Sequence, residues 1–307
     1  MQNILKTNNL TKNYKTQVAV DNANMTINAG DIYGFVGENG AGKTTIIRMI
    51  AGLVNETSGT YELFGTDKNN PNINNVRRKI SAVVESPSLY QNMTAYDNLL
   101  MQCKILGINN PNLIKETLEV VNLAYLINNP KKARNFSLGM KQRLGIAIAL
   151  IGNPDFIILD EPMNGLDPEG IVEVRELIVK LNKEKNITFL ISSHILTELS
   201  RVATKYGFIH RGKMIKEITA KELAEESRKS LEIKVSSTEG MENILKDLGF
   251  KNYKITADEG VKIYEEADIN TIVGKFAQAG ITIKNIANND ENIEEFYLKL
   301  MGGNKHA

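Results

Sequence analysis

The chain has 307 residues and a mass of 34.1 kDa, enough for about two domains. Its 37 lysine and arginine residues nearly balance 36 aspartate and glutamate residues, and the net charge of +1 excludes a surface that is basic throughout, as in dedicated nucleic-acid binders. Cys103 is the single cysteine, which excludes an intramolecular disulfide and fits a cytosolic compartment. Its apolar neighbours predict a small buried side chain rather than a reactive thiol.

The sequence lacks the pattern of a targeting or membrane-spanning segment. Residues 1–14 are polar from the start, without a basic region that leads into an apolar one. The best apolar candidates, residues 146–151 and 156–159, fall far short of the roughly 18 residues that a membrane span needs. If the protein acts at a membrane, we expect another chain to supply the spans.

Residues 1–219 predict an α/β domain. Residues 4–30 alternate between apolar and polar side chains and contain turn residues, a pattern typical of antiparallel strands. From Asp31 on, short apolar runs alternate with helical patterns, which indicates a parallel sheet covered by helices. The expected strands of that sheet are residues 32–36, 80–84, 156–159 and 187–191, each too short for a helix and too apolar for a half-exposed strand.

Three further patterns complete this domain. Residues 86–152 lack a strand pattern and predict an all-helical insert. Residues 169–183 predict a helix with apolar side chains three to four positions apart and with Asp167 as its N-cap. Residues 206–218 predict a hairpin that turns at residues 211–212.

Residues 220–307 predict a second, smaller domain of α+β type, because the composition becomes more polar after Thr219. The expected order is strand, helix, strand, strand, helix, strand, which resembles a ferredoxin-like unit, and a final helix follows. The strands are expected at residues 231–235, 253–257, 261–264 and 281–286, and the helices at 241–248, 269–279 and 291–301.

The strongest chemical signal is a glycine-rich loop with the phosphate-loop pattern, in which two glycines separated by four residues precede lysine and threonine. Glycines allow the backbone N–H groups to face an anion, and the helix that begins near Lys43 adds its positive end. We expect Lys43 to reach the β- and γ-phosphates and the Thr44 hydroxyl to ligate Mg²⁺. The preceding strand and following helix disfavour a chance glycine-rich turn. The loop comprises Gly37, Glu38, Asn39, Gly40, Ala41, Gly42, Lys43, Thr44 and Thr45.

The apolar run at residues 156–159 ends in two adjacent carboxylates, Asp160 and Glu161. At the carboxyl end of a buried parallel strand, Asp160 is placed to hold Mg²⁺ through water, and Glu161 is placed to orient or deprotonate an attacking water. Without other motifs, such a pair fits a solvated strand end at least as well as it fits a catalytic site. Downstream of a phosphate loop, it favours nucleotide hydrolysis.

Residues 135–143, Asn-Phe-Ser-Leu-Gly-Met-Lys-Gln-Arg, stand one helix before the Asp-Glu strand. This segment resembles the signature motif of ABC transporter ATPases, and with the phosphate loop the resemblance covers residues 3–218. It implies an ABC-type phosphate-loop ATPase with an antiparallel β subdomain and a helical subdomain. It also implies that Ser137, Gly139 and the helix after them bind the γ-phosphate of ATP held by a second subunit; Ser137 alone would indicate an ordinary N-cap.

Three more positions match the family pattern. Tyr14 resembles the aromatic residue that stacks on adenine, and a packed surface tyrosine is the alternative. Asp167 resembles the residue that contacts the opposite subunit, and it also fits a simple N-cap. His194, at the end of a buried strand, resembles the switch histidine near the γ-phosphate, although a lone histidine is usually structural. The signature departs from the common Leu-Ser-Gly-Gly-Gln at Leu138 and Met140.

Glu85 follows the strand at residues 80–84, where most ABC ATPases carry glutamine. Glutamate there resembles the bacitracin-resistance and lantibiotic-immunity branch of the family, and a neutral variant without subfamily meaning is the alternative. The family position implies that Glu85 takes part in catalysis and in Mg²⁺ binding, beside Thr44 and Asp160.

The resemblance implies an ATP-hydrolysing subunit of a bacterial ABC exporter that binds Mg²⁺ and ATP between two copies of itself. A separate membrane permease would hold it at the cytoplasmic face of the membrane, the cargo would be a bacitracin-like or lantibiotic peptide, and no nucleic-acid partner is expected. The alternative is an ATP-dependent regulatory protein that transports nothing, although soluble ABC proteins of translation usually carry two cassettes. For residues 220–307 we favour a dimerisation or stabilising domain over a small-molecule sensor.

Overall fold

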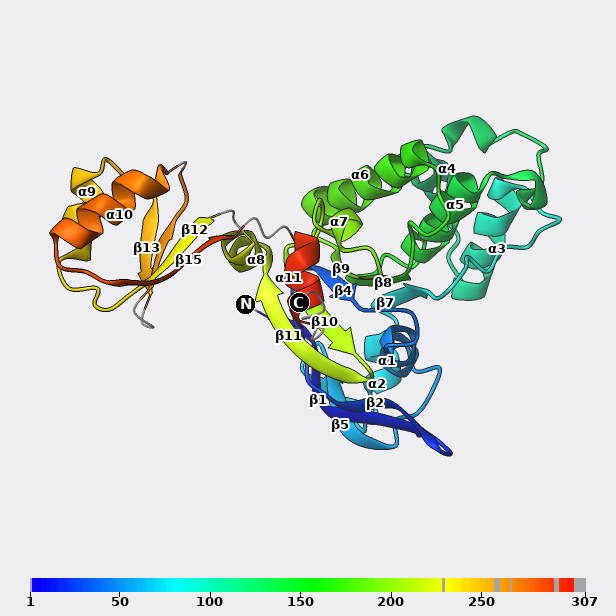
Figure 1. Cartoon of the computed structure of the whole chain (residues 1–307). Coiled ribbons are helices and arrows are strands. Elements are labelled where there is room, and N and C mark those ends of the chain that lie inside the picture. Colours follow the sequence, from blue (N-terminus) through cyan, green and yellow to red (C-terminus); the bar gives the residue numbers. More distant parts are fainter. Residues whose placement is uncertain (1, 228–229, 257–259, 266, 290–292, 301–307) are drawn as a thin grey trace. The chain divides into compact units, whose positions relative to one another are not determined.

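The computed structural model describes residues 2–300 except 228–229, 257–259, 266 and 290–292. The chain divides into two compact units, Met1–Ala220 and Lys221–Ala307 (Figure 1). The boundary that the sequence predicts, between residues 219 and 220, lies one residue from this division. That the two units are separate domains stays a prediction.

The larger unit contains a mainly parallel sheet with the strand order β11-β10-β4-β9-β8-β7. Neighbouring strands from β10 to β7 are parallel, and β11 pairs with β10 as an antiparallel hairpin whose turn residues, Arg211 and Gly212, both have positive φ. Its strands are β4 (Ile32–Val36), β7 (Ile80–Val83), β8 (Phe156–Asp160), β9 (Thr188–Ser193), β10 (Lys205–His210) and β11 (Lys213–Thr219). The expected parallel sheet is therefore confirmed. Strand β9 ends two residues later than predicted because Ser192 and Ser193 still pair with neighbouring strands.

A second sheet is antiparallel, with the order β2-β1-β5-β6 and with β3 paired to β1. Its strands are β1 (Asn3–Tyr14), β2 (Gln17–Ala23), β3 (Thr26–Asn28), β5 (Ser58–Leu63) and β6 (Thr66–Asp67). Residues 4–30 thus form antiparallel strands, as the alternating pattern predicts.

The four longest helices of the larger unit, α3, α4, α5 and α6, begin at side chains that cap them. Thr94 and Asp97 form a capping box, and Asn110, Ser137 and Asp167 each accept a backbone hydrogen bond at a helix start. Between residues 86 and 152, all of which are described, the structure has helices and no strand, as expected of a helical insert. The helices are α1 (Lys43–Ile50), α2 (Ile73–Arg77), α3 (Ala95–Leu106), α4 (Pro111–Val120), η1 (Ala124–Leu126), η2 (Ala133–Asn135), α5 (Leu138–Leu150), α6 (Pro168–Lys185) and α7 (Leu196–Leu199). Helix α8 (Ala220–Glu226) begins at the last residue of this unit and otherwise belongs to the smaller one.

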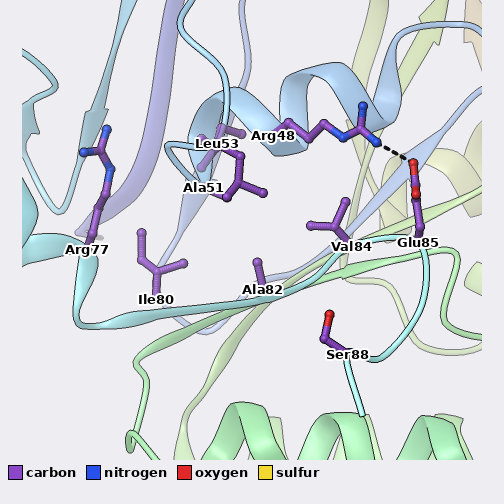
Figure 2. Close-up of a pocket in the computed structure, with 10 residues that line it drawn as sticks. Arg48, Ala51, Leu53, Arg77, Ile80, Ala82, Val84, Glu85 and Ser88 are labelled. Carbon is purple, nitrogen blue, oxygen red and sulfur yellow. Dashed lines mark hydrogen bonds and ion pairs between the residues drawn. The ribbon is translucent and has the colours of Figure 1, made fainter. Parts of the chain in front are cut away.

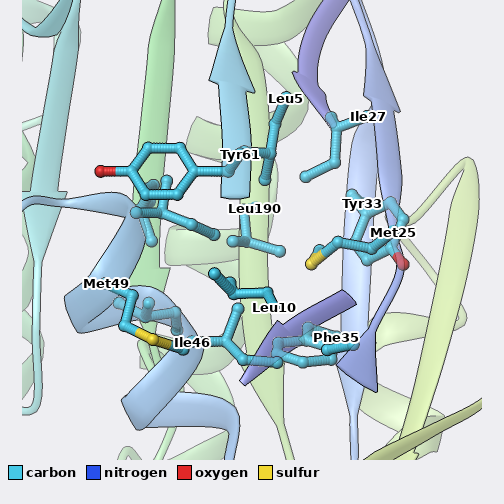
Figure 3. Packing of buried hydrophobic residues seen from close by; sticks show 14 of the residues in the cluster. Leu5, Leu10, Met25, Ile27, Tyr33, Phe35, Ile46, Met49, Tyr61 and Leu190 are labelled. Atoms are coloured by element: carbon cyan, nitrogen blue, oxygen red, sulfur yellow. The ribbon is translucent and has the colours of Figure 1, made fainter. Parts of the chain in front are cut away.

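One hydrophobic cluster joins the two sheets to α1 (Figure 3). Leu10 of β1, Phe35 of β4, Ile46 of α1 and Leu190 of β9 belong to it, and none of these four side chains is exposed. Because the residues between β4 and α1 are anchored at both ends by this cluster, the loop at residues 37–42 has a fixed position. Cys103, in α3, is also buried, and burial raises the pKa of its thiol, as expected of a small core side chain.

Gly207 in β10 leaves room for the ring of Tyr33, whose hydroxyl donates a hydrogen bond to Glu217 at 2.8 Å. A Cβ at Gly207 would collide with that hydroxyl, and we expect Gly207→Ala to lower the free energy of unfolding by about 1–3 kcal/mol. Gly274→Ala is the matched control, because no atom lies within 4 Å of the added Cβ in that helix, and it should be neutral or stabilising. Thermal unfolding followed by circular dichroism measures both; equal melting temperatures for Gly207→Ala and the parent would contradict the packing argument.

The smaller unit has an antiparallel sheet with the order β13-β14-β12-β15 and its own hydrophobic cluster. Its elements are β12 (Ser230–Val235), α9 (Met241–Asp247), β13 (Tyr253–Thr256), β14 (Gly260–Ile263), α10 (Ile269–Gln278), β15 (Ile283–Asn289) and α11 (Ile293–Leu300). The predicted residues 257, 291, 292 and 301 of these elements lie outside the described residues. From β12 on the element order is the expected one, whereas α8 before it was not predicted, and the ferredoxin-like assignment stays a proposal. Among the described residues, no helix is both long and apolar enough to cross a membrane.

Candidate functional site

The loop at residues 37–42 connects β4 to α1, so it lies at the carboxyl end of a fully buried parallel strand. Gly42 is the N-cap of α1 and has a φ of 111°, a left-handed backbone that favours glycine. A Cβ at Gly37 would lie 2.6 Å from the carbonyl oxygen of Ile209, so this position has no room for a side chain. The loop therefore presents its backbone and the N-terminus of α1 on one surface, where an anion is favoured.

Charged and titratable side chains converge at this loop. Lys43 is 5% exposed; its Nζ donates to the carbonyl of Gly37 at 2.5 Å and lies 3.1 Å from Oε1 of Glu161. Nδ1 of His194, just after β9, lies 2.8 Å from Oε2 of Glu161. Burial raises the pKa of Glu198 in α7; the nearby His194 lowers it and the charge of Glu161 raises it. Glu161 thus links the phosphate loop to the end of β9.

Asp160, at the end of β8, is 2% exposed and fully hydrogen-bonded. It accepts hydrogen bonds from the Thr44 hydroxyl at 2.9 Å and from the Ser192 hydroxyl at 2.6 Å, and Ser192 in turn accepts one from the backbone of Glu161 at 2.9 Å. Ser192 was not predicted as a site residue; its signal is its place opposite Asp160 in the parallel register of β8 and β9. A hydroxyl beside a carboxylate is a donor set that fits Mg²⁺.

A cavity of about 320 Å³ opens over the loop. Tyr14, at the end of β1, lines it and is 43% exposed, and Nζ of Lys12 lies 5.0 Å from the centre of the Tyr14 ring. Gln17 and Ala19 also line the cavity, although the sequence had indicated neither. The remaining lining residues are Glu38, Asn39, Gly40, Gly42, Lys43, Thr44, Thr45 and Glu161. A cavity lined by both an exposed aromatic residue and a buried lysine suits a nucleotide, which has a base and phosphates.

Ser137, Gly139 and Asp167 do not line this cavity in the single chain. Ser137 is the N-cap of α5 and accepts a hydrogen bond from the backbone of Met140 at 3.2 Å. Asp167 is the N-cap of α6 and accepts one from the backbone of Gly170 at 3.1 Å. Both side chains therefore have the structural role that each would have without any nucleotide, and their predicted roles across a dimer stay predictions.

Glu85 has a φ of 62° and a side chain that is 64% exposed. Its carboxylate pairs with the guanidinium of Arg48 in α1 at 2.5 Å (Figure 2). Together with Arg77 and Ser88, this pair lines a separate cavity of about 430 Å³. Glu85 is not among the residues that line the cavity over the phosphate loop, so the structure does not bring it together with Thr44 and Asp160, and its predicted metal and catalytic roles stay predictions.

Comparison with known proteins identifies the family. The ABC transporter family profile matches residues 20–164. The chain is 44% identical to the bacitracin transport ATP-binding protein BcrA of Bacillus licheniformis over 307 residues, 99% of each chain. It is 44% identical to the lantibiotic transport ATP-binding protein SrtF of Streptococcus pyogenes over 214 residues, 70% of this chain and 90% of that protein.

The solved structures that resemble this chain include ATP-binding cassettes of ABC transporters. The ADP conformation of MJ1267, an ATP-binding cassette of an ABC transporter, has a TM-score of 0.65 at 26% identity and covers 74% of this chain and 95% of that one. The dimeric post-hydrolysis state of the cassette MJ0796 with ADP and phosphate has a TM-score of 0.62 at 25% identity and covers 70% and 98%. The chain therefore belongs to the family of ABC transporter ATP-binding subunits, and it is an ATPase of the transport-coupled type.

Proposed function

We propose that two copies of this chain bind Mg²⁺ and ATP between them and that hydrolysis drives a separate membrane permease. The observation that carries the proposal is the convergence of Lys43 and His194 on Glu161, beside the hydrogen-bonded pair of Thr44 and Asp160. The dimeric state of MJ0796 with ADP and phosphate supports the two-subunit arrangement.

Different side chains at the cavity bind different parts of the nucleotide. The Tyr14 ring stacks on the adenine, and Lys43 with the N–H groups of the loop binds the β- and γ-phosphates. Thr44 and Asp160 would hold Mg²⁺, which when bound neutralises charge on the phosphates. Lys43 already contacts the carbonyl of Gly37, so its ammonium is oriented along the loop before a phosphate arrives.

The chemical step uses Glu161 as the base that takes a proton from the attacking water. His194 fixes the direction of that carboxylate through its contact with Oε2, and its proposed position is near the γ-phosphate. Ser137 and the N-terminus of α5 come from the second subunit and bind the γ-phosphate from the other side, with Asp167 contacting the opposite subunit. ATP hydrolysis by the purified chain, measured with and without Mg²⁺, tests the proposal for the site.

The transported cargo is a bacitracin-like or lantibiotic peptide, and the chain acts at the cytoplasmic face of the membrane through its permease. The similarity to BcrA and SrtF supports this cargo. The helical insert offers apolar side chains for contact with a permease: Tyr90, Ile105, Leu106 and Tyr125 are 46–63% exposed. Co-purification from membranes should recover a hydrophobic partner chain, and recovery of this chain alone would favour a regulatory protein that transports nothing.

Glu85→Gln is expected to retain ATPase activity in the isolated subunit, because Thr44, Asp160 and Glu161 remain. It should lose part of the permease-dependent peptide resistance in cells, because Glu85 lies in the connection from β7 to the helical insert and loses its ion pair with Arg48. A Mg²⁺ titration of hydrolysis and a resistance assay with the permease present measure the two effects. If neither changes, Glu85 is a neutral variant.

A further inference from the structure

Two helix N-termini that matter for the proposed dimer lie side by side in the larger unit. A Cβ at Gly139, in the first turn of α5, would lie 3.9 Å from Cα of Gly170, in the first turn of α6. A Cβ at Gly165, just before α6, would lie 3.3 Å from Cδ2 of Leu138. Leu138 thus packs on the loop that leads to Asp167. The first turns of α5 and α6 approach each other closely because Gly139 and Gly170 have no side chains.

One turn further along, the same two helices are joined by an ion pair. Nη2 of Arg143 in α5 lies 3.2 Å from Oε2 of Glu173 in α6, and Nη1 donates to the carbonyl of Asn122 at 3.2 Å. Since Gly139 meets Gly170 and Arg143 meets Glu173, the helices run in the same direction with their N-termini together. The Arg143 side chain is 9% exposed, whereas that of Glu173 is 35% exposed, so the ion pair lies at the edge of the buried region.

The N-termini of parallel helices carry partial positive charges that repel each other, so their alignment has to be held by contacts between the helices, such as the ion pair of Arg143 with Glu173. A planar guanidinium bound to two partners also fixes direction, which a lysine ammonium cannot do because it is a point charge on a flexible stem.

We propose that Arg143 is a positioning residue that holds the N-terminus of α5 in register with that of α6 through Glu173. Ser137 and Asp167 are thereby presented as one surface to the nucleotide held by a second subunit. The inference rests on the proposed function, because it assigns the pair a role only in the shared site. Arg143 touches neither the cavity over the phosphate loop nor Lys43, so nucleotide binding by a single subunit does not depend on it.

The test uses the full chain with Glu161→Gln, in which ATP should persist and hold the dimer. Arg143→Lys and Glu173→Gln are each added to this parent, and Glu176→Gln, at an exposed position of the same helix, is the matched control. Dimer formation with ATP is measured by sedimentation over a range of protein concentrations. Binding of a fluorescent ADP analogue and thermal unfolding are measured on the same samples.

Arg143→Lys should raise the dimer dissociation constant about ten- to a hundredfold, with a smaller effect in the same direction for Glu173→Gln and none for Glu176→Gln. The affinity of a single subunit for the ADP analogue should stay unchanged. The charge reversal Arg143→Glu with Glu173→Arg should restore part of the dimerisation, since the contact with Asn122 is not recovered.

Dimerisation of Arg143→Lys at the level of the parent would overturn the inference while leaving the proposed function intact. The inference would also be overturned if the variants that dimerise less also bind the ADP analogue more weakly or melt at a lower temperature to a corresponding degree. The ion pair would then have only a structural role. If the Glu161→Gln parent itself fails to dimerise with ATP, the proposed function is wrong and this inference with it.

Discussion

Glu161→Gln is expected to lower kcat for ATP hydrolysis by about 10²–10⁴-fold while ATP still binds. The carboxylate is the only basic group of the site that contacts both Lys43 and His194 in the described part of the chain, and an amide of the same shape cannot accept a proton from water. The amide oxygen keeps a neutral acceptor for Lys43, so the cavity should retain its form. Phosphate release measures the rate, and light scattering measures the dimer that unhydrolysed ATP should trap.

The control for this variant is Glu184→Gln, an exposed carboxylate of α6 away from the site, which should hydrolyse ATP at the parent rate. Thermal unfolding of Glu161→Gln should also be recorded, because Lys43 is buried and loses a charged partner. Turnover near the parent rate in a folded Glu161→Gln protein would show that another group, such as His194, acts as the base.

The parts of this fold that the sequence predicts best are those in which local chemistry and burial agree. The apolar runs that become β4, β8 and β9 are buried along their whole length in a parallel sheet, so their composition alone distinguishes them from half-exposed strands. The run that becomes β7 was expected to be equally buried, but β7 is an edge strand and is only partly buried, with Ala82 exposed. The N-caps Ser137 and Asp167 were predictable for the same reason, since a capping side chain bonds to its own helix. The phosphate loop was predictable because its glycines are required by the backbone itself.

The parts that the sequence did not predict depend on where side chains point or on partners distant in the chain. The ion pair of Glu85 with Arg48, 37 residues earlier, was not predicted, because a residue pattern carries no information on such a contact; the predicted metal and catalytic roles of Glu85 stay predictions. Ser192 supports Asp160 only because β8 and β9 are in parallel register, a pairing that spans 32 residues. The contact of Arg143 with Glu173 likewise requires the packing of α5 on α6.

A mixture of Lys43→Ala and Ser137→Ala subunits is expected to recover ATPase activity that each variant alone has lost. Lys43→Ala removes the buried ammonium that faces the loop, and its loss should cost about 10²-fold or more in rate. Ser137→Ala removes the N-cap of α5 and the hydroxyl that would face the γ-phosphate of the other subunit. Homodimers of either variant then contain two damaged sites, so each variant alone should be nearly inactive.

In a mixed dimer, one site combines the intact loop of one subunit with the intact signature segment of the other. Random pairing makes half of all dimers mixed, each with one intact site, so the mixture should recover about a quarter of the parent rate if the sites act independently. Differently tagged subunits, purified in succession, verify that mixed dimers form. If such dimers hydrolyse ATP as poorly as either variant alone, then Ser137 does not serve the loop of the opposite subunit. If Ser137→Ala homodimers instead hydrolyse ATP at the rate of the unmodified chain, then Ser137 serves only as the N-cap of α5.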